Sequence, residues 1–585
     1  MKQVLKRLIK SIYDFRIGFI LGILGVILLT ALNLWIPLIG RRMIDDVLTP
    51  VSLGRPINTS LLVKLLAMYV GVNIISTILS YASRLKLQYV SNDIVKQMRN
   101  QLLEKMNQLP VKYFDEHPAG SIVSRLINDT EVLRKDFYVR VIADLLISCI
   151  SIIGTYVMLF YLDFRLATAL LLILPIIFIW QHLYTKYMTP IQISVREKIS
   201  ELNSKINEYL TGVTLIQMFQ KEQHFLYLFK KNSKEIFDLN RRSIFAQSLF
   251  VWGFGDILRD GTILIFLLYI SQGYITGQMA ITAGMLYVFI DYINRLFAPV
   301  QMFVNGISNI QQSLATGKRV FEFMDEPVES FETNRFEIKE GKVRFEDIMF
   351  SYKEGEPILK RINLNVQSGE TIGLVGTTGS GKSTLLNLLF RYYEPDSGQI
   401  YIDDIPISEV NRHQMRQDMA IVLQDPYLFT GTIASNIRMN QTDLSDDDVR
   451  KVLEQVGAGY LIENYKEGIY HEVREHGADF SSGERQLISF ARALAAKPKI
   501  LMLDEATSHV DTETEQIIQQ AMDVLKEGRT TFIIAHRLST IQNADRIVVI
   551  SNGEIVEIGK HEDLLNNRGI YYTMYMNQKE KSSSC

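Results

Sequence analysis

Residues 371–384 read Thr-Ile-Gly-Leu-Val-Gly-Thr-Thr-Gly-Ser-Gly-Lys-Ser-Thr, and this stretch decides the fold of the carboxyl-terminal part of the chain. Its first five residues form an apolar run that predicts a buried strand. The glycine-rich segment after them matches a phosphate-binding loop, and a helical pattern begins at Thr384. Backbone N–H groups of such a loop surround phosphates, and the helix amino terminus adds the positive end of its dipole. The stretch therefore predicts an α/β domain that binds ATP.

The residues of this loop have separate expected roles. We expect Lys382 to reach the terminal phosphates and the Ser383 hydroxyl to ligate Mg²⁺, so that ATP and Mg²⁺ are the predicted cofactors. The loop residues predicted to contact ATP are Gly376, Thr377, Thr378, Gly379, Ser380, Gly381, Lys382, Ser383 and Thr384.

A second apolar run, 500–503, ends in two acidic residues. Asp504 follows the run directly and is expected to hold Mg²⁺, as the acid of a Walker B motif does. Glu505 comes next and is placed to polarise the water that attacks the γ-phosphate. Glu505 is therefore a predicted catalytic residue.

Two further apolar runs also end in polar residues. The run 531–534 precedes His536, which we expect to contact the γ-phosphate and the water, and the run 419–423 precedes Gln424, a candidate sensor of Mg²⁺ and water. Ligand sites of α/β proteins form at the carboxyl edge of a parallel sheet. We therefore expect His536 and Gln424 to join Glu505 as catalytic residues at one such edge.

The amino-terminal part contains six long apolar runs. The run 17–39 carries no charge and is long enough to cross a bilayer about 30 Å thick. It could be taken for a signal peptide, but no small-residue cleavage site precedes Arg41 and Arg42. The predicted spans are 17–39, 65–81, 139–162, 166–184, 245–275 and 285–304.

Loop charge predicts the orientation of these spans. Segment 86–135 carries eight Lys and Arg residues and segment 186–242 carries ten, whereas 271–284 carries none. By the positive-inside rule, both termini and the ATPase domain lie in the cytoplasm, and the chain is a multi-pass protein of the cytoplasmic (cell) membrane with the lipid bilayer as a partner. A soluble protein with six buried helices is the alternative, and it does not account for this charge asymmetry.

Charged residues also occur inside or at the ends of the predicted spans. Asp256, Arg259 and Asp260 lie in the fifth span, and Arg140 and Asp144 open the third. Their spacing allows pairing on one helix face. They either neutralise one another near a helix end or line a cavity that contacts polar or cationic cargo.

Composition excludes other classes of protein. The chain has 585 residues, with 62 basic and 64 acidic side chains, so nucleic acid is not expected as a partner. Its two cysteines, Cys149 and Cys585, exclude a disulfide framework and a cysteine-rich zinc site. The expected organisation is a transmembrane domain (1–325), a linker (326–340), an ATPase domain (341–578) and a tail (579–585). The fold class is a membrane all-α domain of six helices followed by an α/β P-loop ATPase domain.

These motifs resemble ABC exporter half-transporters of the six-span type I exporter class, also called type IV, over nearly the whole chain. Residues 480–486, Phe-Ser-Ser-Gly-Glu-Arg-Gln, are similar to the family signature LSGGQ-x-Q. The resemblance implies that Ser481 and Gly483 contact ATP held by a partner's phosphate loop. It also implies that Tyr352 stacks on the adenine ring.

The resemblance extends to the long loops between spans. Residues 113–120 resemble the first intracellular loop of the family, and residues 208–222 resemble the second. In the family, short coupling helices in these loops dock on the ATPase domain. The resemblance places them near 114–124 and 210–215.

The signature departs from the family pattern at two positions. Ser482 stands where a glycine is usual, and Glu484 replaces a glutamine, so a Cβ and an added carboxylate lie beside ATP and weaken that contact. The chain's own Lys382, Asp504 and Glu505 are intact. This combination resembles the catalytically intact subunit of bacterial heterodimeric multidrug exporters. It implies a second, different half-transporter with a full LSGGQ signature and no catalytic glutamate; a homodimer that tolerates the variation is the alternative.

The resemblance implies ATP-driven efflux of hydrophobic or amphipathic small molecules by alternating access. A homodimeric lipid or peptide exporter is one alternative function. An ATP-gated channel or a sensor with the same motifs is another. Measurements of flux distinguish these functions, because a transporter moves cargo in a fixed ratio to ATP, whereas a channel passes ions down their gradient.

Overall fold

The computed structural model describes residues 1–52, 56–275, 282–329, 336–353, 355–439, 441, 443–504, 512–534 and 540–583. The chain forms two compact units. The first contains Met1–Asn107 and Pro118–Pro327, and the second contains Gln108–His117 and Val328–Cys585. A short piece of the predicted first intracellular loop therefore belongs to the second unit.

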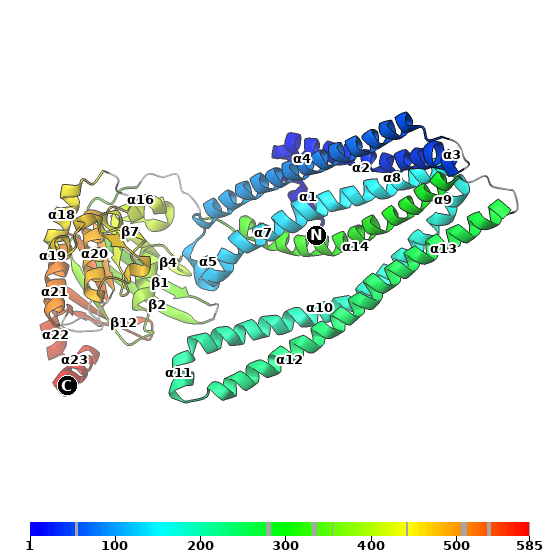
Figure 1. The fold of residues 1–585 in the computed structure, drawn as a ribbon. Helices are drawn as coiled ribbons and strands as arrows, with labels where there is room; N and C mark the ends of the chain where they lie inside the picture. The colour runs from blue at the N-terminus through cyan, green and yellow to red at the C-terminus, as the bar shows by residue number, and fades with distance from the viewer. Residues whose placement is uncertain are drawn as a thin grey trace. The chain divides into compact units, whose positions relative to one another are not determined.

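The first unit is built of long helices (Figure 1). Helix α2 packs along α4, α14 packs against α8 and α2, and α10 pairs with α12. Its elements are α1 (Lys2–Lys10), η1 (Tyr13–Phe15), α2 (Arg16–Met43), η2 (Ile44–Leu48), α3 (Thr49–Ser52), α4 (Thr59–Met106), α6 (Ala119–Ser124), η3 (Arg125–Asp129), α7 (Thr130–Val132), η4 (Leu133–Asp144), α8 (Leu145–Leu162), α9 (Phe164–Leu171), α10 (Ile173–Thr211), α11 (Val213–Met218), α12 (Glu222–Gln247), η5 (Ser248–Gly253), α13 (Phe254–Ile275) and α14 (Ala283–Asp325).

Four helical stretches among the described residues are long and apolar enough to cross a membrane. They contain the first three predicted spans and all but the first residue of the fourth. The fifth predicted span, 245–275, covers the end of α12, η5 and α13, and the sixth, 285–304, lies on α14. Helix α13 carries Asp256, Arg259 and Asp260, the charged residues noted in the sequence. The four stretches are Lys2–Leu48, Thr59–Met106, Ala119–Leu162 and Ala167–Thr211.

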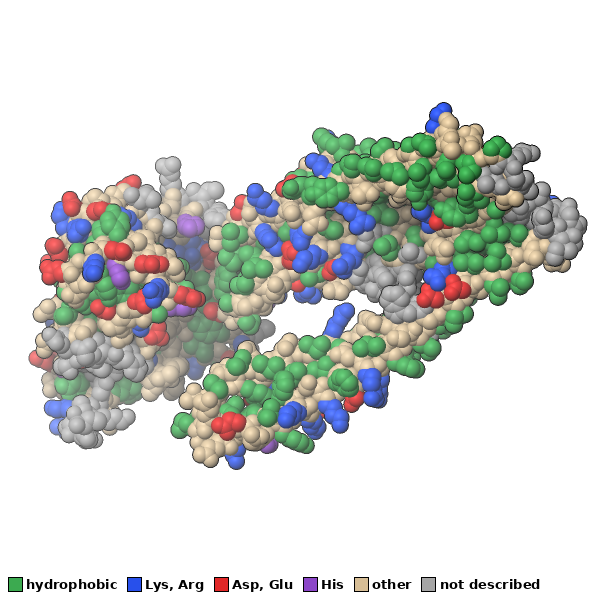
Figure 2. Space-filling view, viewed as in Figure 1, with side chains coloured by type: hydrophobic (Ala, Val, Ile, Leu, Met, Phe, Trp, Pro, Cys, Tyr) green, Lys and Arg blue, Asp and Glu red, His purple; other side chains and the backbone are tan. Residues whose placement is uncertain are grey.

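The exposed apolar side chains agree with a membrane location for these helices. Ile20 on α2, Ile78 on α4 and Ile153 on α8 are all more than half exposed. Figure 2 shows hydrophobic side chains over long stretches of the helices and many charged ones on the second unit. Large apolar surfaces of this kind require a partner or a lipid phase.

The turn between the third and fourth predicted spans is tight. Helix α8 ends at Leu162 and α9 begins at Phe164, so only Asp163 lies between them. The Asp163 carboxylate accepts a hydrogen bond from the backbone N–H of Arg165 (2.8 Å), which caps the new helix.

The charged residues of the spans pair on their own helices. Arg259 forms an ion pair with Asp256 (3.0 Å), as the i,i+3 spacing predicts, and a second with the adjacent Asp260 (2.9 Å), which that spacing does not predict. Arg140 pairs with Asp136 one turn earlier (3.0 Å). The side chain of Asp144, the partner that the spacing suggested, lies outside the part of the chain that the structure describes.

The predicted coupling helices form, but with different bounds. The segment 114–124 is divided into α5 (Val111–Glu116) and α6, because Pro118 forces His117 into an extended conformation. The second helix, α11, begins at Val213 and not at Leu210, which still belongs to α10. Gly212 interrupts the helix between them, as expected for the weakest ordinary helix former.

The second unit contains a mostly parallel sheet of six strands in the order β12-β11-β3-β10-β9-β6 and an antiparallel sheet of four. Strands β3, β10, β9 and β6 run parallel, as predicted. The strands are β1 (Val343–Ser351), β2 (Pro357–Val366), β3 (Thr371–Val375), β4 (Ser397–Ile402), β5 (Ile405–Pro406), β6 (Met419–Val422), β7 (Gly431–Thr432), β8 (Glu472–Val473), β9 (Ile500–Asp504), β10 (Thr530–Ile534), β11 (Arg546–Ser551) and β12 (Glu554–Gly559).

Helices cover the parallel sheet and bury two hydrophobic cores. One core includes Leu385 and Leu388 of α15, and the other includes Leu487 and Phe490 of α20. The helical elements are α15 (Lys382–Leu389), η6 (Ile407–Glu409), α16 (Arg412–Gln417), α17 (Ile433–Arg438), α18 (Asp446–Gln455), α19 (Tyr460–Asn464), η7 (Gly468–Tyr470), η8 (Glu475–Gly477), α20 (Ser482–Ala495), α21 (Thr512–Lys526), α22 (His561–Asn566) and α23 (Ile570–Ser583).

Part of the segment expected to be a linker packs into the second unit. Phe336 and Ile338 are buried in one of its cores. Glu329 forms ion pairs with Arg412 (3.3 Å) and Arg416 (3.5 Å). The Asp403 carboxylate accepts hydrogen bonds from the four consecutive backbone N–H groups of 339–342. These contacts fix the start of the ATPase fold.

Candidate functional site

The phosphate loop connects β3 to α15 through a tight backbone path. A Cβ on Gly376 would lie 2.2 Å from the carbonyl oxygen of Ile550, so only glycine fits there. Gly381 has φ +106°, a conformation that glycine adopts without strain. Because Gly381 turns the chain, α15 begins at Lys382, two residues earlier than the helical pattern predicted.

The Lys382 side chain is buried beside the loop. Its Nζ donates hydrogen bonds to the carbonyl oxygens of Gly376 (2.8 Å) and Thr377 (3.1 Å). The Ser380 hydroxyl is buried and has no hydrogen-bond partner among the described residues. An ammonium group and an unpaired hydroxyl in one glycine-rich loop fit a phosphate ligand.

The other predicted loop residues differ in exposure. Thr377, Thr378, Gly379 and Ser383 are not buried and are therefore accessible to a ligand from solution. Thr384 is buried, and its Oγ1 accepts a hydrogen bond from the Tyr352 hydroxyl (3.3 Å).

Strand register brings the predicted polar ends to one edge of the sheet. Ile534 of β10 lies opposite both Leu374 of β3 and Asp504 of β9, so these three residues form one row. Val422 of β6 lies opposite Leu503. Gln424 therefore lies one residue beyond the row that contains Asp504, and Gln424 is exposed. The phosphate loop, Asp504 and Gln424 share the carboxyl edge, as expected.

Two predicted catalytic residues, Glu505 and His536, lie outside the described residues. In the sequence, Glu505 comes one residue after the end of β9, and His536 comes two residues after the end of β10. Their predicted roles rest on the sequence.

Tyr352 belongs to a cluster of three aromatic rings. Its ring meets Tyr393 edge to face at 5.0 Å, and Phe350 packs against Tyr352 at 4.9 Å and Tyr393 at 5.6 Å. Tyr352 is itself about two-fifths exposed, which leaves a face open for stacking. The cluster therefore holds the predicted adenine-binding ring in place.

Tyr393 connects this cluster to α5. Its hydroxyl donates a hydrogen bond to the carboxylate of Asp115. Burial, and then the Asp115 hydrogen bond and charge, raise the pKa of Tyr393 well above its usual value of 10.0. The phenol therefore stays protonated and remains a donor at physiological pH.

The signature helix, α20, begins with a reciprocal cap. Ser481 Oγ accepts a hydrogen bond from the backbone N–H of Glu484 (3.2 Å), and Glu484 Oε2 accepts one from the backbone N–H of Ser481 (2.7 Å). This capping box satisfies two of the free N–H groups at the helix start. It also places a carboxylate next to Ser481 and Gly483, the residues predicted to contact ATP.

Comparisons with known proteins place these features in a family. The family model "ABC transporter transmembrane region" matches residues 19–300, and the model "ABC transporter" matches residues 359–508. A "probable multidrug resistance ABC transporter ATP-binding/permease protein", YheH of Bacillus subtilis, is 42% identical over 89% of this chain and 78% of its own length. The chain is an ABC exporter half-transporter. It belongs to the ABC transporter family, so ATP hydrolysis coupled to transport across a membrane follows from membership.

The chain is also similar to a second relative and to a solved structure. A fatty acid ABC transporter ATP-binding/permease protein of Mycobacterium tuberculosis is 31% identical over 92% of this chain and 85% of its own length. The solved structure of a bacterial Atm1-family ABC exporter with ATP bound is 25% identical, with a TM-score of 0.81 over 96% of this chain and 98% of that one. ABC exporters act as dimers in the membrane.

Two contacts of the exporter were missed by the sequence reasoning. The capping box had a visible signal, because Ser481 and Glu484 have the Ser-x-x-Glu spacing of that motif. The pair of Tyr393 and Asp115 had none, because 278 residues separate them.

Proposed function

We propose that this chain is the catalytically intact subunit of a heterodimeric multidrug exporter. Its partner is a second half-transporter with a full LSGGQ signature and no catalytic glutamate. The observation that carries the proposal is the Glu484 carboxylate, which the capping box with Ser481 holds at the start of α20.

The negative charge of Glu484 opposes the usual role of a signature helix. A helix amino terminus binds phosphate through its free N–H groups and its dipole. Here Glu484 already accepts from the backbone N–H of Ser481 and adds a negative charge. A γ-phosphate brought to this helix by a partner meets a like charge. The site built with this signature is thus the impaired one.

The chain's own phosphate loop serves the competent site in this proposal. Lys382 holds the terminal phosphates, and the buried Ser380 hydroxyl becomes a further donor to them. Tyr352 stacks on adenine. Ser383, Gln424 and Asp504 hold Mg²⁺, which when bound neutralises phosphate charge. The other loop contacts to ATP are Gly376, Thr377, Thr378, Gly379, Gly381 and Thr384.

Two residues carry the hydrolytic chemistry of the competent site. Glu505 orients and polarises the attacking water, and His536 contacts the γ-phosphate and that water. Gln424 reports the presence of Mg²⁺ and water to the rest of the domain. Ser481 and Gly483 face the partner's ATP.

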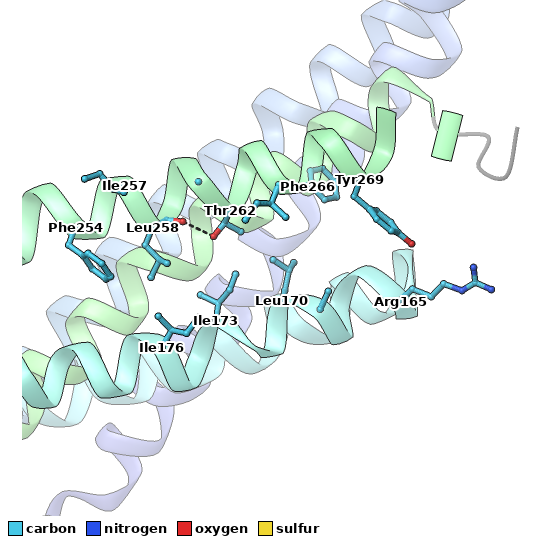
Figure 3. A pocket seen from close by; sticks show the side chains of 13 residues that line it. Arg165, Leu170, Ile173, Ile176, Phe254, Ile257, Leu258, Thr262, Phe266 and Tyr269 are labelled. Carbon is cyan, nitrogen blue, oxygen red and sulfur yellow. Dashed lines mark hydrogen bonds between the residues drawn. The ribbon is translucent and has the colours of Figure 1, made fainter. Parts of the chain in front are cut away.

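An apolar cavity in the first unit supports the proposal that the cargo is hydrophobic. It has a volume of about 460 Å³ and lies between α9 and α10 on one side and α13 on the other. Figure 3 shows Leu170, Ile173 and Ile176 facing Leu258 and Phe266 across it. The Thr262 hydroxyl donates to the carbonyl of Leu258 (2.6 Å), so this polar group is satisfied by its own helix and the wall stays apolar.

A lipid exporter is the second candidate function. The relative from Mycobacterium tuberculosis is named a fatty acid transporter. An apolar cavity also accepts an acyl chain. Transport of a labelled fatty acid into vesicles, compared with transport of a hydrophobic dye, separates the two cargo classes.

Coupling between the two activities is proposed to run through the intracellular loops. Closure of the ATPase domains around two ATP molecules is transmitted by α5 and α11, and the helical bundle then opens outward. The contact of Asp115 with Tyr393 supports α5 in this role. Both termini and the ATPase domain (341–578) lie in the cytoplasm of a cell whose cytoplasmic membrane holds the helical domain (1–325).

Expression of the chain alone tests the heterodimer. We expect weak ATPase activity without a partner, and strong cargo-stimulated activity when a half-transporter with a full signature is co-expressed. Robust cargo-stimulated activity of the chain alone that disappears in Glu505→Gln would contradict the proposal. The same result would favour a homodimer.

A further inference from the structure

Two adjoining cavities form a basic groove between α4 and the helix that contains α7 and η4. One has a volume of about 530 Å³ and the other about 370 Å³, and both are lined by Gln88 and Arg134. We call them together the basic groove. Its other lining residues are Arg84, Asn92, Val95, Lys96, Arg99 and Asn100 from α4, with Glu131, Lys135, Val139 and Arg140 from the facing helix.

The groove begins where the apolar parts of two membrane helices end. Arg84 is the first cation after the apolar part of α4, and Arg140 is the last before the apolar run that continues into α8. Both residues line the smaller cavity. In the orientation proposed above, this cavity lies at the head-group level of the inner leaflet, and the larger one extends toward the cytoplasm.

Positive charge is in excess along the groove. Six cations line it, and Glu131 is the one carboxylate among the lining residues. Glu131 contacts Arg134 (2.6 Å), Lys135 (3.2 Å) and Arg99 (3.5 Å), so one carboxylate serves three cations.

Three cations of the groove are poorly neutralised. Arg140, at the membrane end, pairs with Asp136 (3.0 Å) but remains about half exposed. Arg84, also at the membrane end, and Lys96, in the larger cavity, are exposed and form no ion pair with another described residue. The groove therefore offers free cationic donors beside an amide, Gln88, that can also donate.

We propose that the basic groove binds the phosphate of an anionic phospholipid from the inner leaflet. Guanidinium groups bind phosphate oxygens in pairs through parallel N–H donors. Basic pockets between membrane helices on the cytoplasmic side hold anionic lipid head groups. The inference rests on the proposed orientation of the chain and is independent of the cargo and of the heterodimer. A soluble phosphate compound shares this chemistry, and the location of Arg84 and Arg140 at the apolar boundary favours the lipid.

The test measures lipid retained by the purified full chain. The protein is reconstituted in nanodiscs of equal parts phosphatidylglycerol and phosphatidylcholine, and the lipids that remain bound after extraction are counted by native mass spectrometry. We expect the double variant Arg84→Gln/Arg140→Gln to lower the ratio of phosphatidylglycerol to phosphatidylcholine by about fivefold, because two charge-assisted contacts are lost. The matched control Lys230→Gln/Lys231→Gln removes two exposed charges of α12 and should leave the ratio unchanged.

Three outcomes overturn the proposal. Equal retention in the groove variant and the unchanged chain shows that lipid does not bind there, and equal loss in the control variant shows attraction to the whole basic surface. Displacement of the lipid by millimolar inorganic phosphate assigns the groove to soluble phosphate. The charge-retaining variant Arg84→Lys/Arg140→Lys should still retain most of the phosphatidylglycerol. Such a result would show that the glutamine variant loses lipid because charge is removed and not because the protein misfolds.

The assay uses neither ATP nor cargo, so a failed efflux proposal does not affect it. The orientation is checked separately by protease digestion of the carboxyl-terminal tail in sealed vesicles of known sidedness.

Discussion

Glu484 and Ser481 cap each other at the start of the signature helix, through hydrogen bonds of 2.7 and 3.2 Å. The family signature LSGGQ also has the Ser-x-x-Gln spacing of a capping box, so the negative charge of Glu484, and not the cap itself, distinguishes this helix start. This charge is the structural basis of the asymmetry that we propose between the two ATP sites.

Glu484→Gln should restore part of the contact between the signature helix and the γ-phosphate of the partner's ATP. Glutamine keeps the reciprocal cap and removes the charge, which relieves about 1 kcal/mol of repulsion and corresponds to about fivefold in ATP affinity. We expect a higher ATPase rate of the dimer at limiting ATP. The matched control is Asp448→Asn in the same type of cap with Ser445 at the start of α18, remote from the signature in the sequence. An equal rise in the control would show a general charge effect.

Tyr393→Phe should uncouple cargo from hydrolysis. The change removes the hydrogen bond to Asp115 and keeps the ring that supports Tyr352. We therefore expect unchanged ATP binding and a lower ratio of cargo-stimulated to basal ATPase rate. Tyr470→Phe is the control, because its hydroxyl also donates to a carboxylate, that of Asp446 (2.6 Å), on α18. Full stimulation in Tyr393→Phe would contradict the role of this contact.

Lys382→Ala and Glu505→Gln should fail at different steps. Loss of the buried ammonium should weaken ATP binding about tenfold or more, since a charge-assisted contact to phosphate is removed. Glu505→Gln should keep ATP binding and lower turnover by about 10²-fold or more. Titration with a fluorescent ATP analogue and a phosphate-release assay measure the two steps. Near-normal hydrolysis in either variant refutes the corresponding role.

Asp129→Asn should destabilise the helical unit. Both carboxylate oxygens of Asp129 accept from Arg319 of α14, at 2.6 and 3.0 Å, and the carboxylate is largely buried. Because Arg319 is about half exposed, we expect a loss of about 1–2 kcal/mol, seen as a lower thermal transition in detergent. Glu322→Gln breaks the exposed pair with Lys318 (3.5 Å) and should change stability by less than about 0.5 kcal/mol.

Ile173→Trp should change the cargo range. The larger ring fills part of the apolar cavity, so efflux of large hydrophobic dyes should fall while basal ATPase activity stays. Leu268→Trp is the control, because Leu268 is exposed on α13 and does not line the cavity. Dye accumulation in cells that express each variant measures the effect. Unchanged efflux of every dye in Ile173→Trp removes the cavity from the transport path.

Much of the nucleotide site could be predicted because its signals are local. The run 371–375 is β3 to the residue, Asp504 is the last residue of β9, and Gln424 comes two residues after β6, so the apolar runs indicated all three strands. The start of α15 was misplaced by two residues, because the left-handed conformation of Gly381 is a backbone property that a helical pattern does not contain. Glu505 and His536 remain predictions.

The long-range contacts could not be predicted in the same way. Asp403 binds the backbone of 339–342, and Arg319 binds Asp129 across 190 residues. Each of these side chains is an ordinary charged residue in its own neighbourhood. Nothing local distinguishes it from a solvated one.

The sequence by itself determined the two-part architecture of this exporter, because apolar run length, loop charge and the glycine-rich loop are each written in consecutive residues. Only the tertiary structure decided which distant groups meet. Tyr393 reaches Asp115 of α5, and α4 and η4 bring six cations to one groove. Such long-range contacts depend on how packed helices and strands are rotated and spaced relative to one another. The burial of whole surfaces, and not any single residue, sets this rotation and spacing.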